Sequence, residues 1–201
     1  MLSEAMSKII PNLKESLRYV APTTVYCTSK EEFDQEIGSD FIKTVNQVTQ
    51  NNEEFLVGLS HGKSPSGAYN YILDHYDEIL HPERIHYTCI NSKLLRQRGL
   101  IDFMDAISFL KALISTNKIN KDQILGRSLD RENLEAYKNG LNSSLTEYLS
   151  KLNKKGLDYV FLASTATGQV AGITKNSTSF KSNDLVVIVK DTLEPELTYT
   201  P

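Results

Sequence analysis

The sequence predicts an α/β protein with a doubly wound, mostly parallel sheet that carries helices on both faces. Short apolar runs recur along the chain, and between them lie longer stretches in which apolar residues follow helical spacing. Strands that are apolar throughout are typical of parallel sheets, because crossover helices bury both faces of such a sheet. With 201 residues, of which 40% are hydrophobic, the chain has the length and composition for one well-buried core.

Four apolar runs are expected to be the core strands, and they are residues 55–59, 85–90, 157–163 and 185–189. In a doubly wound sheet, ligands bind outside the carboxyl ends of the strands, where the strand order reverses. The loops that follow Leu59, Ile90 and Ala163 are therefore the expected place of a functional site. An earlier β-branched and aromatic run, residues 24–28, is expected to form a strand that leads into the first crossover helix.

Helices are expected between these strands. Ser29, followed by Glu31 and Glu32, has the pattern of an N-cap with acidic residues in the first turn. The apolar residues that follow fall on one helical face, which comprises Phe33, Ile37, Phe41, Ile42 and Val45. Two further amphipathic helices are expected at residues 100–114 and 133–152, because their apolar residues also form a stripe.

The turn after the first core strand is rich in Gly and Ser, and it is the stretch that points to a function. Gly58 and Gly62 free the backbone to direct consecutive N–H groups at one concave spot. With Ser64 as N-cap and Pro65 as the first helical residue, the positive end of the next helix faces the same spot. Lys63 adds a positive charge. The pattern favours a phosphate ligand, although an ordinary, well-capped strand-to-helix connection has similar residues.

Two other loop patterns share letters with this stretch. A nucleotide-binding P-loop requires G-x-x-x-x-G-K-[ST], but its first Gly corresponds to Val57, and Gly58 comes one residue too late. The letters G-x-S-x-G of a hydrolase nucleophile elbow occur at residues 58–62, yet that site also needs a later His, and no His follows His86. Both patterns are weaker alternatives.

The loop GLSHGKSP, residues 58–65, resembles the G-L-[ST]-G-G-[ST]-T-P loop of the glucosamine-6-phosphate isomerase/deaminase and 6-phosphogluconolactonase superfamily. The resemblance continues in family order to about residue 180, through IHYTCINSKLL, NKDQILGRSLDRENLEAYKNGL and LDYVFLASTATGQVAGI. It implies a Rossmann-like domain whose partner is a small sugar phosphate. By position, it also implies the phosphate-binding residues, which are Ser60, His61, Gly62, Lys63 and Ser64.

The residues that transfer protons in that family are replaced in this sequence. Asn91 stands where the family has an Asp after the third strand, Thr167 and Gln169 replace the Asp and His of its D-G-H motif, and Thr174 replaces a later acid. None of these side chains exchanges a proton near neutral pH as a carboxylate or an imidazole does. The resemblance therefore implies a sugar-phosphate-binding protein with little or no catalysis, whose substrate contacts are Asn91, Thr167, Gly168 and Gln169.

An active isomerase or lactonase with a relocated base is the alternative. His61 stands where the family usually has Gly and is the candidate for such a base, while Asn91 and Gln169 would orient the substrate or a water molecule. His86 is expected to be a packed or an edge residue of a strand, and the two histidines between it and the loop are expected at the surface.

Composition and charge exclude several classes of partner. The formal net charge is −3 and the Lys residues are scattered, so neither nucleic acid nor an anionic membrane is expected as a partner. Cys27 and Cys89 lie in apolar runs without a second ligand at metal-site spacing, so we expect buried thiols in a reducing compartment and no metal ion or cofactor. The N-terminus suits neither a signal peptide nor a membrane span, which predicts a cytoplasmic protein.

The C-terminal residues DTLEPELTYTP follow an apolar strand without a closing helix, whereas the resembled family continues through further strand and helix units. We therefore expect one domain over residues 1–201 that is either a fragment or a shortened relative. An open sheet edge is expected in both cases, covered by a missing C-terminal segment or by a second copy of the chain.

Overall fold

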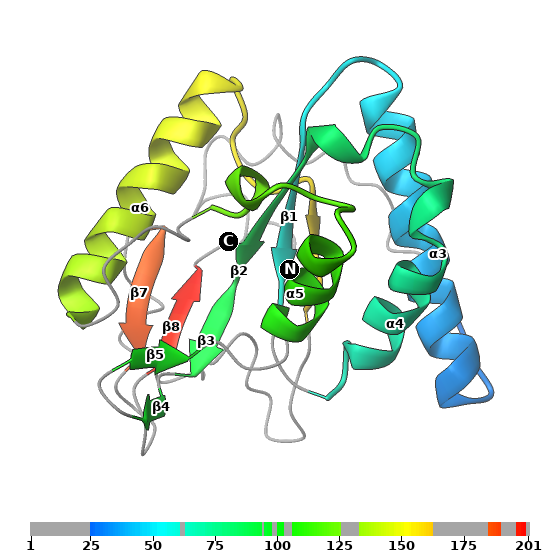
Figure 1. Cartoon of the computed structure of the whole chain (residues 1–201), viewed down its shortest axis with the longest axis horizontal. Helices are drawn as coiled ribbons and strands as arrows, with labels where there is room; N and C mark the ends of the chain where they lie inside the picture. The colour runs from blue at the N-terminus through cyan, green and yellow to red at the C-terminus, as the bar shows by residue number, and fades with distance from the viewer. Residues whose placement is uncertain are drawn as a thin grey trace, which may run out of the picture.

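A computed structural model describes the fold for residues 25–60, 63–93, 95–97, 100–102, 106–125, 133–162, 185–189 and 196–199. At the centre of this part of the chain is a parallel sheet with the strand order β2-β1-β6 (Figure 1). These strands are Ile85–Cys89, Phe55–Leu59 and Tyr159–Val160. The prediction of an α/β fold with a parallel sheet is confirmed, while the doubly wound strand order stays a prediction.

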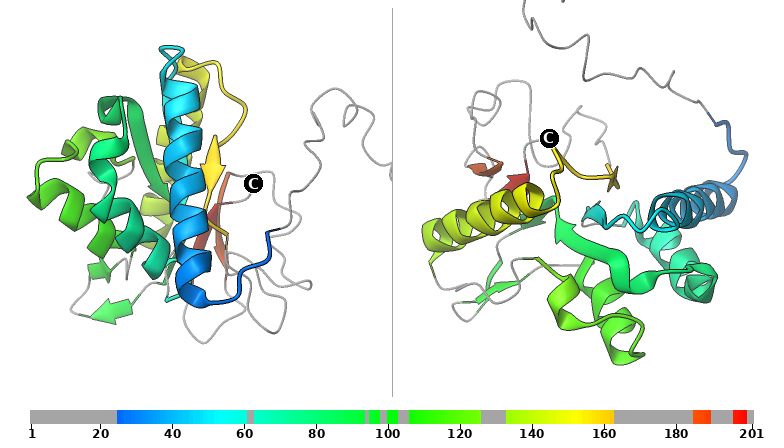
Figure 2. Two further views of the ribbon diagram at one scale, coloured as in Figure 1. Left: turned by 90° about the vertical axis from the view of Figure 1, so that its right-hand side faces the viewer. Right: turned by 90° about the horizontal axis from the view of Figure 1, so that it is seen from above.

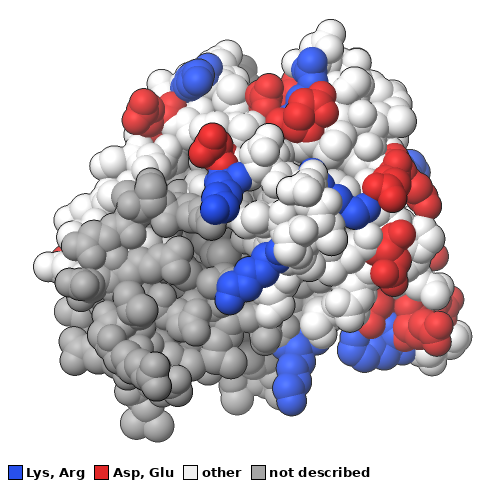
Figure 3. Space-filling model, viewed as in Figure 1, with Lys and Arg blue, Asp and Glu red and all other residues white. Residues whose placement is uncertain are grey.

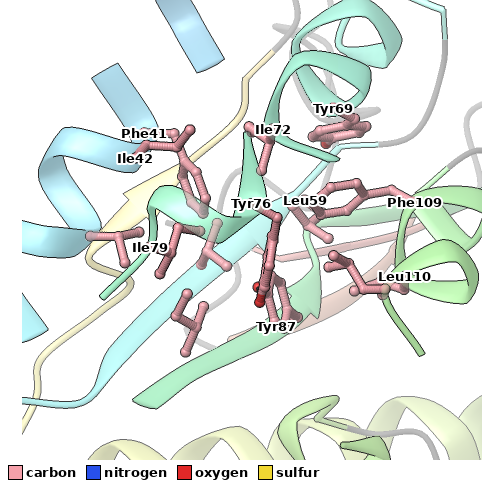
Figure 4. Packing of buried hydrophobic residues seen from close by; sticks show 14 of the residues in the cluster. Phe41, Ile42, Leu59, Tyr69, Ile72, Tyr76, Ile79, Tyr87, Phe109 and Leu110 are labelled. Carbon is pink, nitrogen blue, oxygen red and sulfur yellow. The ribbon is translucent and has the colours of Figure 1, made fainter. Parts of the chain in front are cut away.

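Helices cover both faces of the parallel sheet (Figure 1, Figure 2). On one face, α3 (Lys30–Thr49), α4 (Ser66–Asp74) and α5 (Ala106–Ser115) share a hydrophobic cluster with β1 and β2 (Figure 4). On the other face, α6 (Leu134–Lys151) forms a second cluster with Ile90. The 3₁₀ helices of the described residues are η1 (Tyr76–Glu78), η2 (Pro82–Arg84) and η3 (Lys121–Gln123).

β1 is buried along its whole length and lies between the two other strands. Phe55, Val57 and Leu59 belong to the cluster beneath α3, α4 and α5. Gly58 faces the opposite side, where a Cβ would collide with Ile90. Gly58 is therefore a strand residue whose missing side chain leaves room for the chain that continues from β2. The strand predicted at residues 55–59 is thus confirmed, whereas the predicted role of Gly58 in shaping the turn is wrong.

α3 and α4 touch through two glycines. A Cβ on Gly38 would collide with the ring of Tyr71, and a Cβ on Gly67 would collide with the carboxylate of Asp34. Since residues 34 and 38 face residues 67 and 71 in the same order, the two helices run in the same direction. The absence of two side chains at this contact thus fixes how closely the helices approach.

The segment before α3 differs from its prediction. Residues 25–28 form no strand, and Val25 and Tyr26 are 58% and 88% exposed. β-branched and aromatic residues favour a strand only where a neighbouring strand and a packed face receive them. The predicted N-cap is confirmed, because the Ser29 hydroxyl accepts a hydrogen bond of 3.1 Å from the Glu32 N–H.

The last strands of the chain are antiparallel. β3 (Asn91–Lys93), β8 (Glu196–Tyr199) and β7 (Val186–Val189) form a sheet in the order β3-β8-β7, and both of its pairings are antiparallel. The prediction that residues 185–189 form a core strand of the parallel sheet is therefore wrong. An apolar run indicates a buried strand, but it does not indicate the direction of its neighbour.

The helix predicted at residues 100–114 starts later than expected. Leu100–Asp102 is β5, which pairs antiparallel with β4 (Leu95–Gln97), and α5 begins at Ala106. Only Arg98 and Gly99 separate the two strands in the sequence, but the helical spacing of the apolar residues conceals them. The helix predicted at 133–152 is confirmed as α6, with Asn133 as its N-cap.

The described surface carries charges of both signs. Figure 3 shows Lys and Arg side chains interspersed with Asp and Glu over the described part of one face. Cys27 and Cys89 form no disulfide bond and are only partly buried, so the expectation of buried thiols is wrong in degree. Among the described residues, no group of three His, Cys, Asp or Glu side chains is placed to hold a metal ion, and no helix is long and apolar enough to cross a bilayer.

Two buried phenols make the stability of this fold sensitive to alkali. The hydroxyls of Tyr76 and Tyr87 lie 3.0 Å apart inside the larger cluster (Figure 4). Burial raises the pKa of both phenols, and that of Tyr76 reaches about 12.

We expect the free energy of unfolding to fall as pH rises from about 10 to 12. An unfolded phenol ionises near pH 10 while the folded Tyr76 phenol keeps its proton, so the folded state binds more protons and loses stability with rising pH. Urea titrations across this range measure the slope, which the substitution Tyr76→Phe should reduce. An identical slope in both proteins would contradict the expectation.

The helix contact gives a second prediction. Gly38→Ala should destabilise the protein by about 1 kcal/mol, because overpacking costs about 1–3 kcal/mol and the gain in helix propensity returns about 1 kcal/mol. Gly156→Ala is the matched control, since a Cβ there meets nothing within 4 Å and its effect should stay within about 0.5 kcal/mol. Equal stabilities of the two variants would show that α3 and α4 do not pack through Gly38.

Candidate functional site

The loop after β1 begins with Ser60, which is buried and anchored. The hydroxyl of Tyr69, on α4, donates a hydrogen bond of 2.8 Å to the main-chain carbonyl of Ser60. Burial raises the pKa of the Tyr69 phenol far above its ordinary value, so this hydroxyl remains a donor at neutral pH. The start of the loop is therefore held by the helix into which the loop leads.

Lys63 and Ser64 are exposed immediately before α4. Ser64 is not the N-cap that the sequence predicts, because Pro65 holds that position without a side-chain cap and α4 begins at Ser66. Pro65 already has helical backbone angles, φ −83° and ψ −6°, and the Ser66 hydroxyl donates to the Lys63 carbonyl at 2.7 Å. The predicted start of the helix is thus wrong by one residue.

The first turn of α4 directs main-chain donors toward this loop. The first N–H groups of a helix have no acceptor within the helix, and Tyr69 N–H donates to the Pro65 carbonyl at 2.9 Å at the end of the first turn. The positive end of the helix dipole and the charge of Lys63 lie at the same place. This arrangement suits an anion, and phosphate binding stays a prediction.

Asp34 approaches the same turn from α3. Its carboxylate lies against Gly67, and its side chain is only 14% exposed. Oδ2 pairs with Lys30, while Oδ1 is buried without a hydrogen-bond partner in the described structure. This fixed negative charge stabilises the start of α4 and opposes a second anion there. The sequence does not reveal Asp34, because an Asp in an amphipathic helix is ordinarily solvated.

The exits of the three parallel strands meet beside the loop. Ile90 N–H donates to the Leu59 carbonyl at 2.9 Å, and Phe161 N–H donates to the Gly58 carbonyl at 3.0 Å. The ends of β2 and β6 therefore flank the end of β1, as expected for parallel strands. Asn91 follows directly after this edge, but it is the first residue of β3 and not part of the loop predicted there.

The structure thus places Ser60, Lys63 and Ser64 at the junction of β1 with α4, and the backbone of Asn91 just after the neighbouring strand. The other predicted site residues lie outside the described residues, and they are His61, Gly62, Thr167, Gly168, Gln169 and Thr174. Their roles stay predictions.

A cavity of about 400 Å³ lies at this edge of the sheet, between α3, α4 and β6. It shares Ser64 and Pro65 with the loop, and the rest of its wall is mostly apolar and includes the rings of Phe33, Tyr159 and Phe161. A volume of this size is typical of small-molecule sites. The sequence does not predict the aromatic wall, because its residues are distant in the chain and each is typical of a hydrophobic core.

The histidines outside the loop lie away from this edge or at the surface. His75 and His81 are half-exposed and pair with Glu78 and Glu83, as expected for surface histidines. His86 is packed, as predicted. Its Nε2 lies 2.7 Å from Glu54 and its ring contacts Tyr148, near the amino end of β2.

Comparison with known proteins identifies the fold. Neither a protein-family model nor a curated protein matches the sequence. A 6-phosphogluconolactonase from Plasmodium vivax matches with a TM-score of 0.70 at 16% identity, over 86% of this chain and 68% of that chain. A 6-phosphogluconolactonase from Trypanosoma cruzi matches with a TM-score of 0.67 at 14% identity, over 90% and 75% of the two chains. A monomeric glucosamine-6-phosphate deaminase of the NagB superfamily matches with a TM-score of 0.57 at 18% identity, over 86% and 73%.

The chain therefore has the fold shared by 6-phosphogluconolactonases and glucosamine-6-phosphate deaminases, and the resemblance predicted from the loop is confirmed at the level of fold. At these identities, the likeness concerns the fold alone.

The position of Asp34 generates a prediction about anion binding. Asp34→Asn removes a negative charge beside the first turn of α4 and should tighten the binding of inorganic phosphate by about 1 kcal/mol, roughly five-fold. Asp74→Asn, at the far end of the same helix, is the control and should leave the affinity unchanged. Calorimetric titration measures both affinities. A weaker or unchanged affinity in Asp34→Asn would show that anions do not bind at this turn.

Proposed function

We propose that this chain binds a sugar phosphate at the carboxyl edge of its parallel sheet. The observation that carries the proposal is the junction of β1 with α4. One loop there contains an anchored Ser60 and an exposed Lys63, and it leads into the first turn of a helix. Proteins that act on sugar phosphates share this fold. Main-chain N–H groups at a helix start, together with a Lys charge, match the chemistry of a phosphate group.

The proposed contacts follow the resemblance of the loop. The phosphate is held by main-chain N–H groups, hydroxyls and one ammonium group, from Ser60, His61, Gly62, Lys63 and Ser64. The sugar is contacted from the two neighbouring strand exits, by Asn91, Thr167, Gly168 and Gln169. We further propose that the sheet is doubly wound, that the chain forms one domain, and that the protein is cytoplasmic and does not bind nucleic acid.

Catalysis is proposed to be weak or absent. Isomerisation and lactone hydrolysis both need a positioned proton acceptor, and each such group contributes about 10²–10⁴-fold to the rate. The matched positions hold Asn91, Thr167 and Gln169, which orient a ligand but do not take up a proton at neutral pH. The protein is then a binding protein that has kept the pocket of an enzyme fold.

Ligand-dependent stability tests the binding proposal. Glucosamine 6-phosphate or 6-phosphogluconate at about a hundred times its Kd should raise the free energy of unfolding by about 2.7 kcal/mol, which corresponds to several degrees in Tm. Lys63→Ala should weaken binding by about 1.5 kcal/mol, roughly ten-fold, whereas Lys43→Ala on α3 should not. Stabilisation by ATP with Mg²⁺, without any by sugar phosphates, would instead favour the nucleotide alternative.

Turnover tests the catalytic part separately. We expect no measurable reaction of glucosamine 6-phosphate or 6-phosphogluconolactone with the full chain. A robust rate that the substitution His61→Ala abolishes would identify a relocated base and overturn the non-catalytic proposal. Binding without turnover would support it.

A further inference from the structure

The cavity between α3, α4 and β6 is not explained by phosphate or sugar contacts. Of its described lining residues, only Ser64 and Tyr159 carry polar side chains, and the Tyr159 hydroxyl already donates to Asp40 at 3.0 Å. The lining side chains therefore offer few hydrogen-bond partners to the hydroxyls of a sugar. They offer mostly apolar surface, which suits an apolar group.

The floor of the cavity is formed by packed aromatic rings. The ring of Phe161 lies 5.5 Å from Phe41, 5.1 Å from Tyr69 and 5.1 Å from Tyr159, measured between ring centroids. Tyr69 also holds the Ser60 carbonyl through its hydroxyl. One aromatic cluster thus supports both the cavity floor and the start of the loop, so the two positions are fixed relative to each other.

The rim of the cavity carries two large apolar side chains that solvent reaches. Phe33 from α3 is 46% exposed, and Leu162 after β6 is 56% exposed. Binding of an apolar group that covers both side chains is favourable, because it removes their apolar surface from water. An aromatic ring is the most suitable group, because rings pack on rings in offset or edge-to-face contacts at these distances.

We propose that the ligand is a sugar phosphate that carries an aromatic substituent, with the phosphate at the loop and the ring in this cavity. The inference rests on the proposed function for the phosphate contact. The shared wall supplies the link, because Ser64 and Pro65 belong both to the loop and to the cavity. Lys63 and the helix start attract the charged end, and the apolar wall selects the other end of the same molecule.

Two synthetic probes test this proposal on the full chain. They are phenyl glucoside 6-phosphate and methyl glucoside 6-phosphate, which differ only in the substituent. We expect the phenyl compound to bind at least ten-fold more tightly, because burial of a ring of this size is worth at least that factor. Calorimetric titration measures both dissociation constants.

Substitutions at the rim locate the effect. Phe33→Ala and Leu162→Ala should each remove most of the advantage of the phenyl compound and leave the affinity for the methyl compound within about two-fold. Leu80→Ala is the matched control, because Leu80 is 57% exposed and does not line the cavity. It should change neither affinity.

The outcomes separate this inference from the function on which it rests. If neither probe binds while glucosamine 6-phosphate or 6-phosphogluconate does, the inference fails and the sugar-phosphate proposal stands. If none of the four compounds binds, both fail. If both probes bind equally well, the sugar-phosphate proposal stands and the aromatic substituent is ruled out. Preference for the phenyl compound that persists in Phe33→Ala and Leu162→Ala would place the ring elsewhere and overturn the assignment of the cavity.

Discussion

The burial of β1 on both faces is the constraint on which the rest of the structure depends. A five-residue strand with no exposed side chain needs a partner strand on each edge and packed helices above and below. Gly58 makes this burial feasible, because its face is filled by Ile90 and by residues next to β6. The same packing brings three strand exits together, so the place of the candidate site follows from the packing of its central strand.

Local patterns of the sequence predict much of this architecture. An apolar run predicts β1, the residues after Ser29 predict the start of α3, and the spacing of apolar residues predicts α6. The hairpin of β4 and β5 is not predicted, because its apolar residues also fit helical spacing. The direction of β7 is not predicted either, because it depends on a partner strand that the run itself does not indicate. The strand expected at residues 25–28 fails for the same reason, since β propensity records how well a residue fits a neighbouring surface.

The site is predictable to a smaller degree than the fold. The Gly and Ser residues around Lys63 predict the position of the loop, because the backbone of a tight turn accepts few residue types. Asp34 and Phe33 reach the same place from α3. Both precede the loop by more than 20 residues, and neither belongs to a motif. Such residues are found only when helix packing is known. The polar half of the site is thus a sequence feature, and its apolar half is a feature of tertiary structure.

The pairing of β1 with β6 has a consequence for how the site is assembled during folding. Phe55 pairs with Ile85, 30 residues later, whereas Leu56 and Asp158 are 102 residues apart. Closing the longer loop costs about 1 kcal/mol more in chain entropy, and contacts of this kind form late. β1, α4 and β2 can therefore form a nucleus that already contains the loop of Ser60 and Lys63. The cavity wall from β6 is expected to join afterwards, so the turn that leads into α4 should form before the cavity beside it.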